Sequence, residues 1–213
     1  MLNMIRTIAA TALFSAASVW AGDYEAGVHY KVLDEPQPVA VADEQILVEE
    51  AFWYGCPHCY DLEDNIQPWK SEKADDVVFK GVPAMFGRAW TVHAQLYYTA
   101  EVLGVLPKVH DAIFEAIHLK KQRLLSEGEQ KALMVTIGGV SPEDFDKAYN
   151  SFTVKTRMSQ GDQRVRNFKI DGVPALIVNG KYVVTGKSAG SEEEMINVMN
   201  HLIEKERAAL TES

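Results

Sequence analysis

One segment, Ile46-Leu-Val-Glu-Glu-Ala-Phe-Trp-Tyr-Gly-Cys-Pro-His-Cys59, indicates the fold most directly. Its first nine residues are mainly apolar or aromatic and are followed by Gly55, a pattern typical of a buried strand. Beyond the cysteines, apolar residues recur at helical spacing, namely Leu62, Ile66 and Trp69. Another apolar run, Val77 to Val82, predicts a second strand. The two cysteines are therefore expected where a strand turns into a helix, within a β-α-β unit.

The middle of the chain, residues 91–152, is expected to be helical. Two segments come first: Val92 to Leu103 and Lys108 to Leu119. Ser126 and Glu129 have the spacing of a capping box, which predicts a helix start. Ser141, followed by a proline and two acidic residues, predicts another. The last of these helices is expected to bury an apolar stripe of Phe145, Ala148, Tyr149 and Phe152.

The C-terminal part returns to sheet and helix. The dipeptide Asn179-Gly180 separates two apolar runs, residues 174–178 and 181–185, and this arrangement predicts a hairpin because Asn-Gly suits a tight turn with positive φ. Ser191 and Glu194 predict the start of a final amphipathic helix. The expected order is strand, helix, strand, helical block, hairpin and helix, an α/β fold.

The N-terminus has the features of a secretory signal. Arg6 supplies a positive charge, residues 8–17 form a short apolar run, and Ala21 offers a small residue at a cleavage site. A membrane anchor is the alternative, but the run falls well short of the roughly twenty apolar residues that span a bilayer. We expect an exported protein that is cleaved near Ala21 and contains no transmembrane segment.

Charge argues against nucleic acid as a partner. The chain has 21 Lys and Arg residues against 30 Asp and Glu, a formal net charge of −9, and an acidic surface repels a phosphate backbone. Four basic residues do cluster near the C-terminal third, but such clusters usually form a solvated helix face: Arg157, Arg164, Arg166 and Lys169.

Cys56 and Cys59 are the only cysteines in the chain. The loop that a bridge between them closes is too short to remove much entropy from the unfolded chain, so their chemistry must explain them. Disulfide exchange requires one exposed sulfur that leaves readily as thiolate and a second sulfur within bonding distance. Cys56, at the start of the helix, is expected to be exposed and reactive, and Cys59, one turn further, more buried.

A strongly acidic Cys56 thiol needs several hydrogen-bond donors. Lowering a thiol pKa by about three units requires roughly 4 kcal/mol in favour of the thiolate, whereas a helix dipole commonly supplies about 0.3 to 1 kcal/mol. His58 is the foremost candidate for the rest, together with the backbone N–H groups of His58 and Cys59. Pro57 fits the first helical position, where no N–H is needed. A stabilised Cys56 thiolate makes the disulfide form a stronger oxidant.

A zinc half-site that adds His58 or His93 to the two cysteines is the alternative for this motif. The chain has no second cysteine pair, and residues so close in one motif do not all face one ion. We therefore expect redox chemistry at the motif, with no metal and no cofactor.

Two further features can support such a site. Glu49 and Glu50 interrupt an apolar strand and must point to opposite faces, so one of them can lie buried near the cysteines with a raised pKa, and Lys80 can be its partner. A surface salt bridge remains an equal alternative. The tetrapeptide Gly-Val-Pro-Ala occurs twice, and its second copy, which contains Val173 and Pro174, is the better candidate for a cis-proline turn against the active site. An ordinary strand-entry proline is the alternative.

Three segments together resemble the DsbA family of bacterial periplasmic thiol oxidases: Phe52 to Tyr60, Gly172 to Ala175 and Val178 to Tyr182. The resemblance extends over essentially the whole mature chain and implies a thioredoxin fold with an inserted all-helical domain. It also implies that the buried acid is Glu50, with Lys80 as its partner, and that Val173 and Pro174 receive the substrate backbone. The expected boundaries are 1–21 for the signal peptide, 22–84 and 162–213 for the two parts of the thioredoxin domain, and 85–161 for the helical insertion.

The resemblance further implies a periplasmic enzyme that donates its Cys56–Cys59 disulfide to reduced or unfolded exported proteins. A quinone-linked membrane oxidase of the DsbB type is the implied reoxidant, and we expect a monomer. A disulfide reductase or isomerase remains an alternative, as does a non-catalytic peptide-binding chaperone. Replacing Cys56 by Ser separates the last of these, because only a chaperone keeps its activity.

Overall fold

The computed structural model describes residues 24–211, so the predicted signal peptide lies outside the described residues. The strands are β1 Lys31–Val32, β2 Ile46–Phe52, β3 Val77–Pro83, β4 Ala175–Val178 and β5 Tyr182–Thr185. The helices are α1 Pro57–Glu72, α2 Arg88–Val102, α3 Leu106–His118, α4 Glu127–Thr136, α5 Pro142–Tyr149, α6 Phe152–Asn167, α7 Gly186–Ala189 and α8 Glu192–Thr211. Within residues 24–211, no helix has the length and apolar character needed to cross a membrane.

The five strands form one mixed sheet in the order β1-β5-β4-β2-β3. β2 runs parallel to β3 and antiparallel to β4, and all seven of its residues are buried. This confirms the predicted order of strand, helix, strand, helical block, hairpin and helix. The sequence did not predict β1, α6 or α7 as separate elements, because two of them are very short and α6 has a largely polar sequence.

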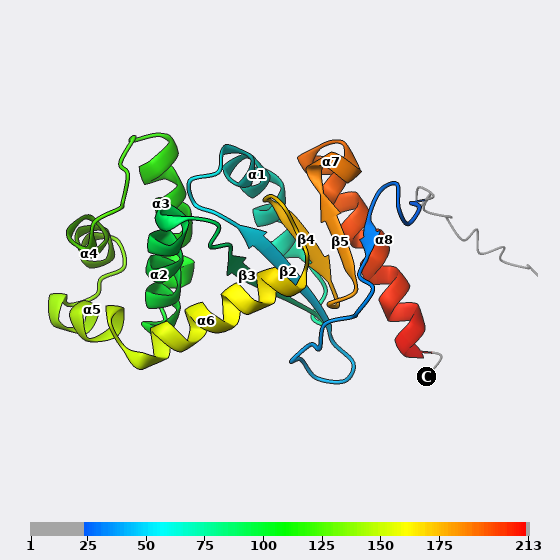
Figure 1. The fold of residues 1–213 in the computed structure, drawn as a ribbon, viewed down its shortest axis with the longest axis horizontal. Helices are drawn as coiled ribbons and strands as arrows, with labels where there is room; N and C mark the ends of the chain where they lie inside the picture. Colours follow the sequence, from blue (N-terminus) through cyan, green and yellow to red (C-terminus); the bar gives the residue numbers. More distant parts are fainter. Residues whose placement is uncertain (1–23, 212–213) are drawn as a thin grey trace, which may run out of the picture.

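Helices cover both faces of the sheet (Figure 1). One face carries α1 and α8, whose Leu62 and Met199 belong to the same apolar cluster as Val48 of β2. The opposite face carries α6, whose Val165 packs in a cluster with Ala51 of β2. A sheet sandwiched in this way, with a β-α-β unit joined to a hairpin and a final helix, is the α/β thioredoxin fold.

The helices α2 to α5 gather at one end of the sheet, and α6 runs back from them across it (Figure 1). Their apolar core is not separate from the sheet, because Phe52 and Tyr54 at the end of β2 belong to the same cluster as Phe114 of α3. Residues of the cysteine motif also pack against this cluster. The predicted domain boundary between residues 161 and 162 falls inside the continuous helix α6.

Local signals in the sequence place several element ends as expected. Ser126 and Glu129 form the predicted capping box of α4, and the Ser141 side chain caps α5. In the hairpin, Asn179 and Gly180 both have positive φ, 50° and 63°. The Lys181 N–H donates to the Val178 carbonyl across this turn at 3.0 Å, so the predicted tight turn is confirmed.

The prediction that Phe152 lies on a buried stripe was wrong. Helix α5 ends at Tyr149, and Ser151 caps a new helix that begins at Phe152. The change of direction between the two helices carries the Phe152 side chain out of the stripe, and it is 85% exposed. Phe145, Ala148 and Tyr149 are buried as predicted.

The contact between α2 and α6 depends on Gly161. A Cβ atom there lies 1.9 Å from the Tyr98 hydroxyl oxygen, far inside van der Waals contact. Although Ala normally stabilises a helix interior relative to Gly by about 1 kcal/mol, we predict that Gly161→Ala destabilises the protein by about 1 to 3 kcal/mol. Urea unfolding measures the change. Gly128→Ala in α4, where nothing lies within 4 Å, is the control and should be neutral or stabilising; equal effects of the two substitutions contradict the account.

Candidate active site

The cysteine motif sits at the start of α1, as the sequence predicts. Cys56 is the N-cap residue with extended backbone (φ −86°, ψ 120°), and Pro57 occupies the first turn, where its missing N–H leaves no bond unmade. The Cys56 N–H donates to the Trp53 carbonyl at 2.9 Å, which fixes the turn from β2 into the helix. Both cysteines are free thiols; Cys56 is partly exposed, and Cys59 is 0% exposed.

The surroundings of Cys56 favour its thiolate. The pKa of this thiol is lowered from 9.0 to about 6, chiefly by the hydrogen bond from the Cys59 thiol. Partial burial opposes the shift, and the backbone N–H groups of Cys59 and His58 and the charge of His58 add to it in that order. The two backbone N–H donors expected from the sequence are present, but the His58 ring acts on the sulfur only through its charge, which is the smallest of these contributions and not the foremost.

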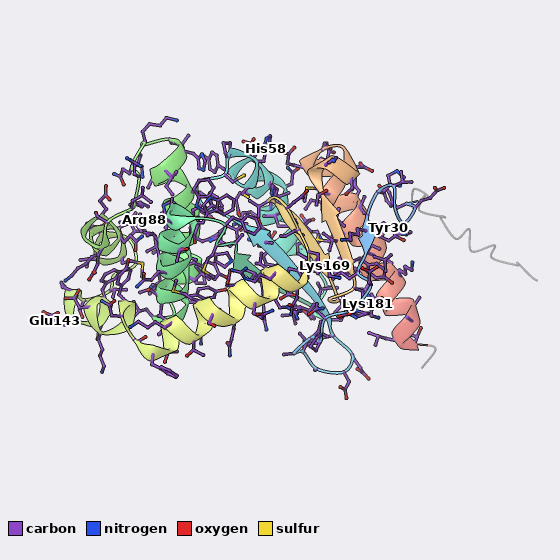
Figure 2. The ribbon with its side chains drawn as sticks, viewed as in Figure 1. Tyr30, His58, Arg88, Glu143, Lys169 and Lys181 are labelled. Carbon is purple, nitrogen blue, oxygen red and sulfur yellow. The ribbon has the colours of Figure 1, made fainter. Side chains whose placement is uncertain are left out.

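The position of the His58 ring explains its small effect. The side chain is 71% exposed, and its Nδ1 lies 3.1 Å from Oε1 of Glu192 in the first turn of α8. Figure 2 shows His58 at the outer end of α1. Because water screens the charge of this ring and the Glu192 carboxylate lies next to it, the ring stabilises the Cys56 thiolate only weakly. The sequence alone could not pair these residues, because they lie 134 positions apart.

Cys59 has the opposite environment. Burial raises the pKa of this thiol well above its usual value, and the hydrogen bond and charge of Cys56 and the charge of Glu50 raise it further. One thiol of the pair is thus held ready to ionise while the other is held protonated. This confirms the predicted asymmetry between the exposed and the buried cysteine.

The second Gly-Val-Pro-Ala segment lies against the cysteines. The Val173–Pro174 peptide bond is cis, which confirms the predicted cis-proline turn. The Val173 carbonyl oxygen lies 3.6 Å from Cys56 Sγ. Beside them opens a pocket of about 440 Å³ lined by residues of three segments, among them His58, Val173, Pro174, Lys187 and Glu192.

The predicted buried acid is Glu50, and the strand alternation that separates it from Glu49 is confirmed. Glu50 lies on the α1 face of β2, is 1% exposed, and its Oε1 has no hydrogen-bond partner. Burial and the nearby negative charge of Glu63 raise its pKa to about 8, while Lys70 opposes the shift. Glu49 faces α6 instead, where Arg164 donates two hydrogen bonds to it at 2.7 and 2.6 Å.

The predicted pairing of Glu50 with Lys80 was wrong. In the parallel β2–β3 ladder Lys80 stands opposite Glu49, while Glu50 stands opposite Gly81. Residues directly opposite in a ladder share a face, so Lys80 lies on the α6 side of the sheet, in a pocket with Glu49 and Arg164. The positive charge that acts on Glu50 is Lys70 of α1.

A polar network next to Glu50 was missed from the sequence. Its members come from α1 and α3: Glu63, Gln67 and His110 with Tyr54 at the end of β2. Glu63 stands four residues after Cys59 and therefore on the same buried face of α1, a signal that was available. The sequence around His110 contains no such signal, because only the packing of α3 against α1 brings His110 next to Glu63.

The geometry defines a class of protein. A thioredoxin fold with a reactive and a buried cysteine at a helix start, and a cis-proline loop in contact with the reactive sulfur, is that of a thiol:disulfide oxidoreductase. A family model for a DSBA-like thioredoxin domain matches residues 61–191.

Relatives extend the match across the chain. The thiol:disulfide interchange protein DsbA of Pseudomonas aeruginosa is 44% identical over 211 residues, which are 98% of this chain and 99% of that protein. The DsbA of Azotobacter vinelandii is 43% identical over 206 residues, 95% of each chain. The crystal structure of Pseudomonas aeruginosa DsbA has a TM-score of 0.83 at 43% identity, covering 89% of this chain and 97% of that one. That of the oxidoreductase DsbA from Xylella fastidiosa has a TM-score of 0.81 at 33% identity, covering 87% and 98%. The chain belongs to the DsbA family and is a protein-disulfide oxidoreductase.

Titration of the Cys56 thiolate tests the ranking of its donors. We predict that Cys59→Ala raises the Cys56 pKa more than His58→Ala does, because the Cys59 thiol is the largest stabilising contact and the His58 charge the smallest. The ultraviolet absorbance of the thiolate, followed against pH in the reduced proteins, measures both shifts. A larger shift in His58→Ala contradicts the ranking.

Glu50 should make stability depend on pH. A carboxyl whose pKa rises from 4.5 to about 8 on folding binds more protons in the folded state, so the wild type loses stability as pH rises through this window. We predict that oxidised Glu50→Gln is more stable than oxidised wild type, by a margin that grows from about pH 4.5 to about pH 8. Urea unfolding across that range measures the margin, and a constant margin contradicts the prediction. Glu49→Gln is the control and should destabilise the protein by roughly 3 kcal/mol, because it removes the negative charge that pairs with Arg164.

Proposed function

We propose that this protein works in the periplasm as a dithiol oxidase that donates its Cys56–Cys59 disulfide to newly exported proteins. The observation that carries the proposal is the opposite environment of the two sulfurs. Because a stabilised Cys56 thiolate lowers the free energy of the reduced form, the oxidised form gives up its disulfide readily. A protein that reduces its partners instead needs an oxidised form that is the more stable of the two.

The proposed cycle has two exchanges. A substrate thiolate attacks Cys56 Sγ, the bond between the two cysteines breaks, and Cys59 leaves as a thiolate that takes up a proton. A second thiolate of the substrate then attacks the substrate sulfur of the mixed disulfide and expels Cys56 as a thiolate. The substrate gains a disulfide and loses two electrons, and the enzyme ends as the dithiol.

Glu50 is proposed as the proton source for Cys59. Its pKa of about 8 keeps it protonated at neutral pH, and once ionised its negative charge raises the pKa of Cys59, so the two groups interact. A buried acid with a pKa near the working pH can pass a proton in either direction. Lys80 takes no part in this transfer, since it lies on the other face of the sheet.

Val173 and Pro174 are proposed to hold the substrate backbone. The Val173 carbonyl points at the Cys56 sulfur, and the adjoining pocket offers room for a side chain next to the reacting cysteine. His58 and Pro57 shape the motif from the helix side, Pro57 by fixing the first turn. An extended, unfolded chain presents its backbone in the way this loop requires.

The cycle requires an electron acceptor, because it leaves Cys56 and Cys59 reduced. We propose a quinone-linked membrane oxidase of the DsbB type in this role, and a monomeric enzyme cleaved near Ala21 after export. The resemblance of the motif to the DsbA family and the secretory features of residues 1–21 support these points. A reductase or isomerase and a peptide-binding chaperone are not favoured, since the relatives over the whole chain are thiol:disulfide interchange proteins.

Two single substitutions test the proposal. We predict that Cys56→Ser abolishes oxidation of a reduced peptide with two cysteines, because no sulfur remains to accept the first attack. Cys59→Ala keeps Cys56 but has no partner to close the disulfide. After activation with a small aromatic disulfide it should form a mixed disulfide with a peptide that carries one cysteine. Mass spectrometry and the peptide's free-thiol content measure both results. Oxidase activity in Cys56→Ser, or capture of peptide by Cys56→Ser but not by Cys59→Ala, contradicts the mechanism.

A further inference from the structure

Three metal-ligating side chains converge beside the active-site helix. Glu63 of α1 and His110 and Asp111 of α3 each bring a ligand atom to within 4.8 Å of the others. No cysteine belongs to this group, which is therefore distinct from the zinc half-site considered for the sequence motif. We call these three residues the α1–α3 cluster.

The spacing of the α1–α3 cluster suits a transition metal. Glu63 Oε1 and His110 Nε2 are 3.3 Å apart. Two ligands bound at 2.0–2.1 Å to a tetrahedral ion stand about 3.3 to 3.4 Å apart, so this pair already has the separation of a bound pair. Gln67 reaches both carboxylates with its amide nitrogen, at 2.6 Å for Glu63 and 2.9 Å for Asp111, and so draws Asp111 toward the same point.

The second nitrogen of His110 is held in the way that metal-binding imidazoles usually require. Nδ1 lies 2.8 Å from the Tyr54 hydroxyl oxygen. When Nδ1–H donates to that oxygen, the lone pair of Nε2 faces the Glu63 carboxylate. Histidine ligands commonly have their other ring nitrogen bonded to such an outer group, which fixes the tautomer and the ring orientation.

An independent observation also points to a cation here. Glu50, which is almost completely buried, has an oxygen without a hydrogen-bond partner. It lines a cavity of about 250 Å³ together with Gln67, Lys70, His110 and Asp111. Ionising a buried carboxyl is costly, and a cation in the cavity offsets that cost and gives this oxygen a partner.

We propose that Glu63, His110 and Asp111 bind one divalent ion of the zinc class, with Glu50 facing it across the cavity. Imidazole and carboxylate ligands together suit zinc among the available ions. The ion competes with the ammonium group of Lys70, whose Nζ lies 3.8 Å from Oε2 of Glu63. Since Glu63 shares α1 with the cysteines, the bound ion ties the active-site helix to the helical block.

Calorimetric titration with zinc chloride tests the site on untagged mature protein in the oxidised form, in which the disulfide removes both thiols as ligands. We expect one ion per chain. Asp111→Asn and His110→Gln should each weaken binding by at least about ten-fold. Lys70→Met should strengthen it, because a competing charge is gone. His201→Gln on α8, outside the cluster, is the control and should leave binding unchanged.

Several results overturn the proposal: no binding by the oxidised wild type, more than one equivalent site, or equal affinity of wild type and Asp111→Asn. Asp111 is exposed, so Asp111→Asn should fold even where His110→Gln does not, and circular dichroism checks both. Weakening by His201→Gln equal to that by Asp111→Asn indicates surface binding and also overturns it. None of these outcomes touches the proposed oxidase function, because no thiol takes part in the measurement.

Discussion

The chemistry of this protein depends on one interaction, the stabilisation of a thiolate at Cys56 by donors that the start of α1 holds in place. The Cys59 thiol and two backbone N–H groups provide most of it. These donors converge only if the helix begins at Pro57 and the turn from β2 is fixed by the bond from Cys56 to Trp53. The sheet and the two layers of helices are thus what hold three weak donors on one sulfur, where a helix dipole alone contributes about 1 kcal/mol at most.

The same helix creates the contrast on which directional chemistry relies. One turn of α1 carries the chain from the partly exposed Cys56 to the fully buried Cys59, and burial moves the pKa of the second thiol upward while hydrogen bonds move that of the first downward. Glu50 extends this pattern into the sheet as a buried acid whose Oε1 has no hydrogen-bond partner. Burying this acid lowers the stability of the fold, and the gain that we propose is a group that exchanges a proton with the buried sulfur.

Much of the fold and of the active site was predictable from the sequence, because these features follow from short-range patterns. Hydrophobic periodicity located β2 and α1, the Asn179-Gly180 pair located the hairpin, and strand alternation separated Glu49 from Glu50. The predictions that were wrong depend on the long-range register of the strands and on the packing of the helices. The offset between β2 and β3 decides which face Lys80 occupies, and no local pattern states that offset.

The contacts of His58 with α8 and of His110 with α1 were not predictable for the same reason, since each joins helices far apart in the chain.

Equilibration of the purified protein with glutathione tests the central claim most directly, because it measures how far the environment of the Cys56 thiolate favours the dithiol form. The account predicts that the dithiol persists in glutathione mixtures oxidising enough to convert thioredoxin fully to its disulfide. A potential as reducing as that of thioredoxin contradicts it.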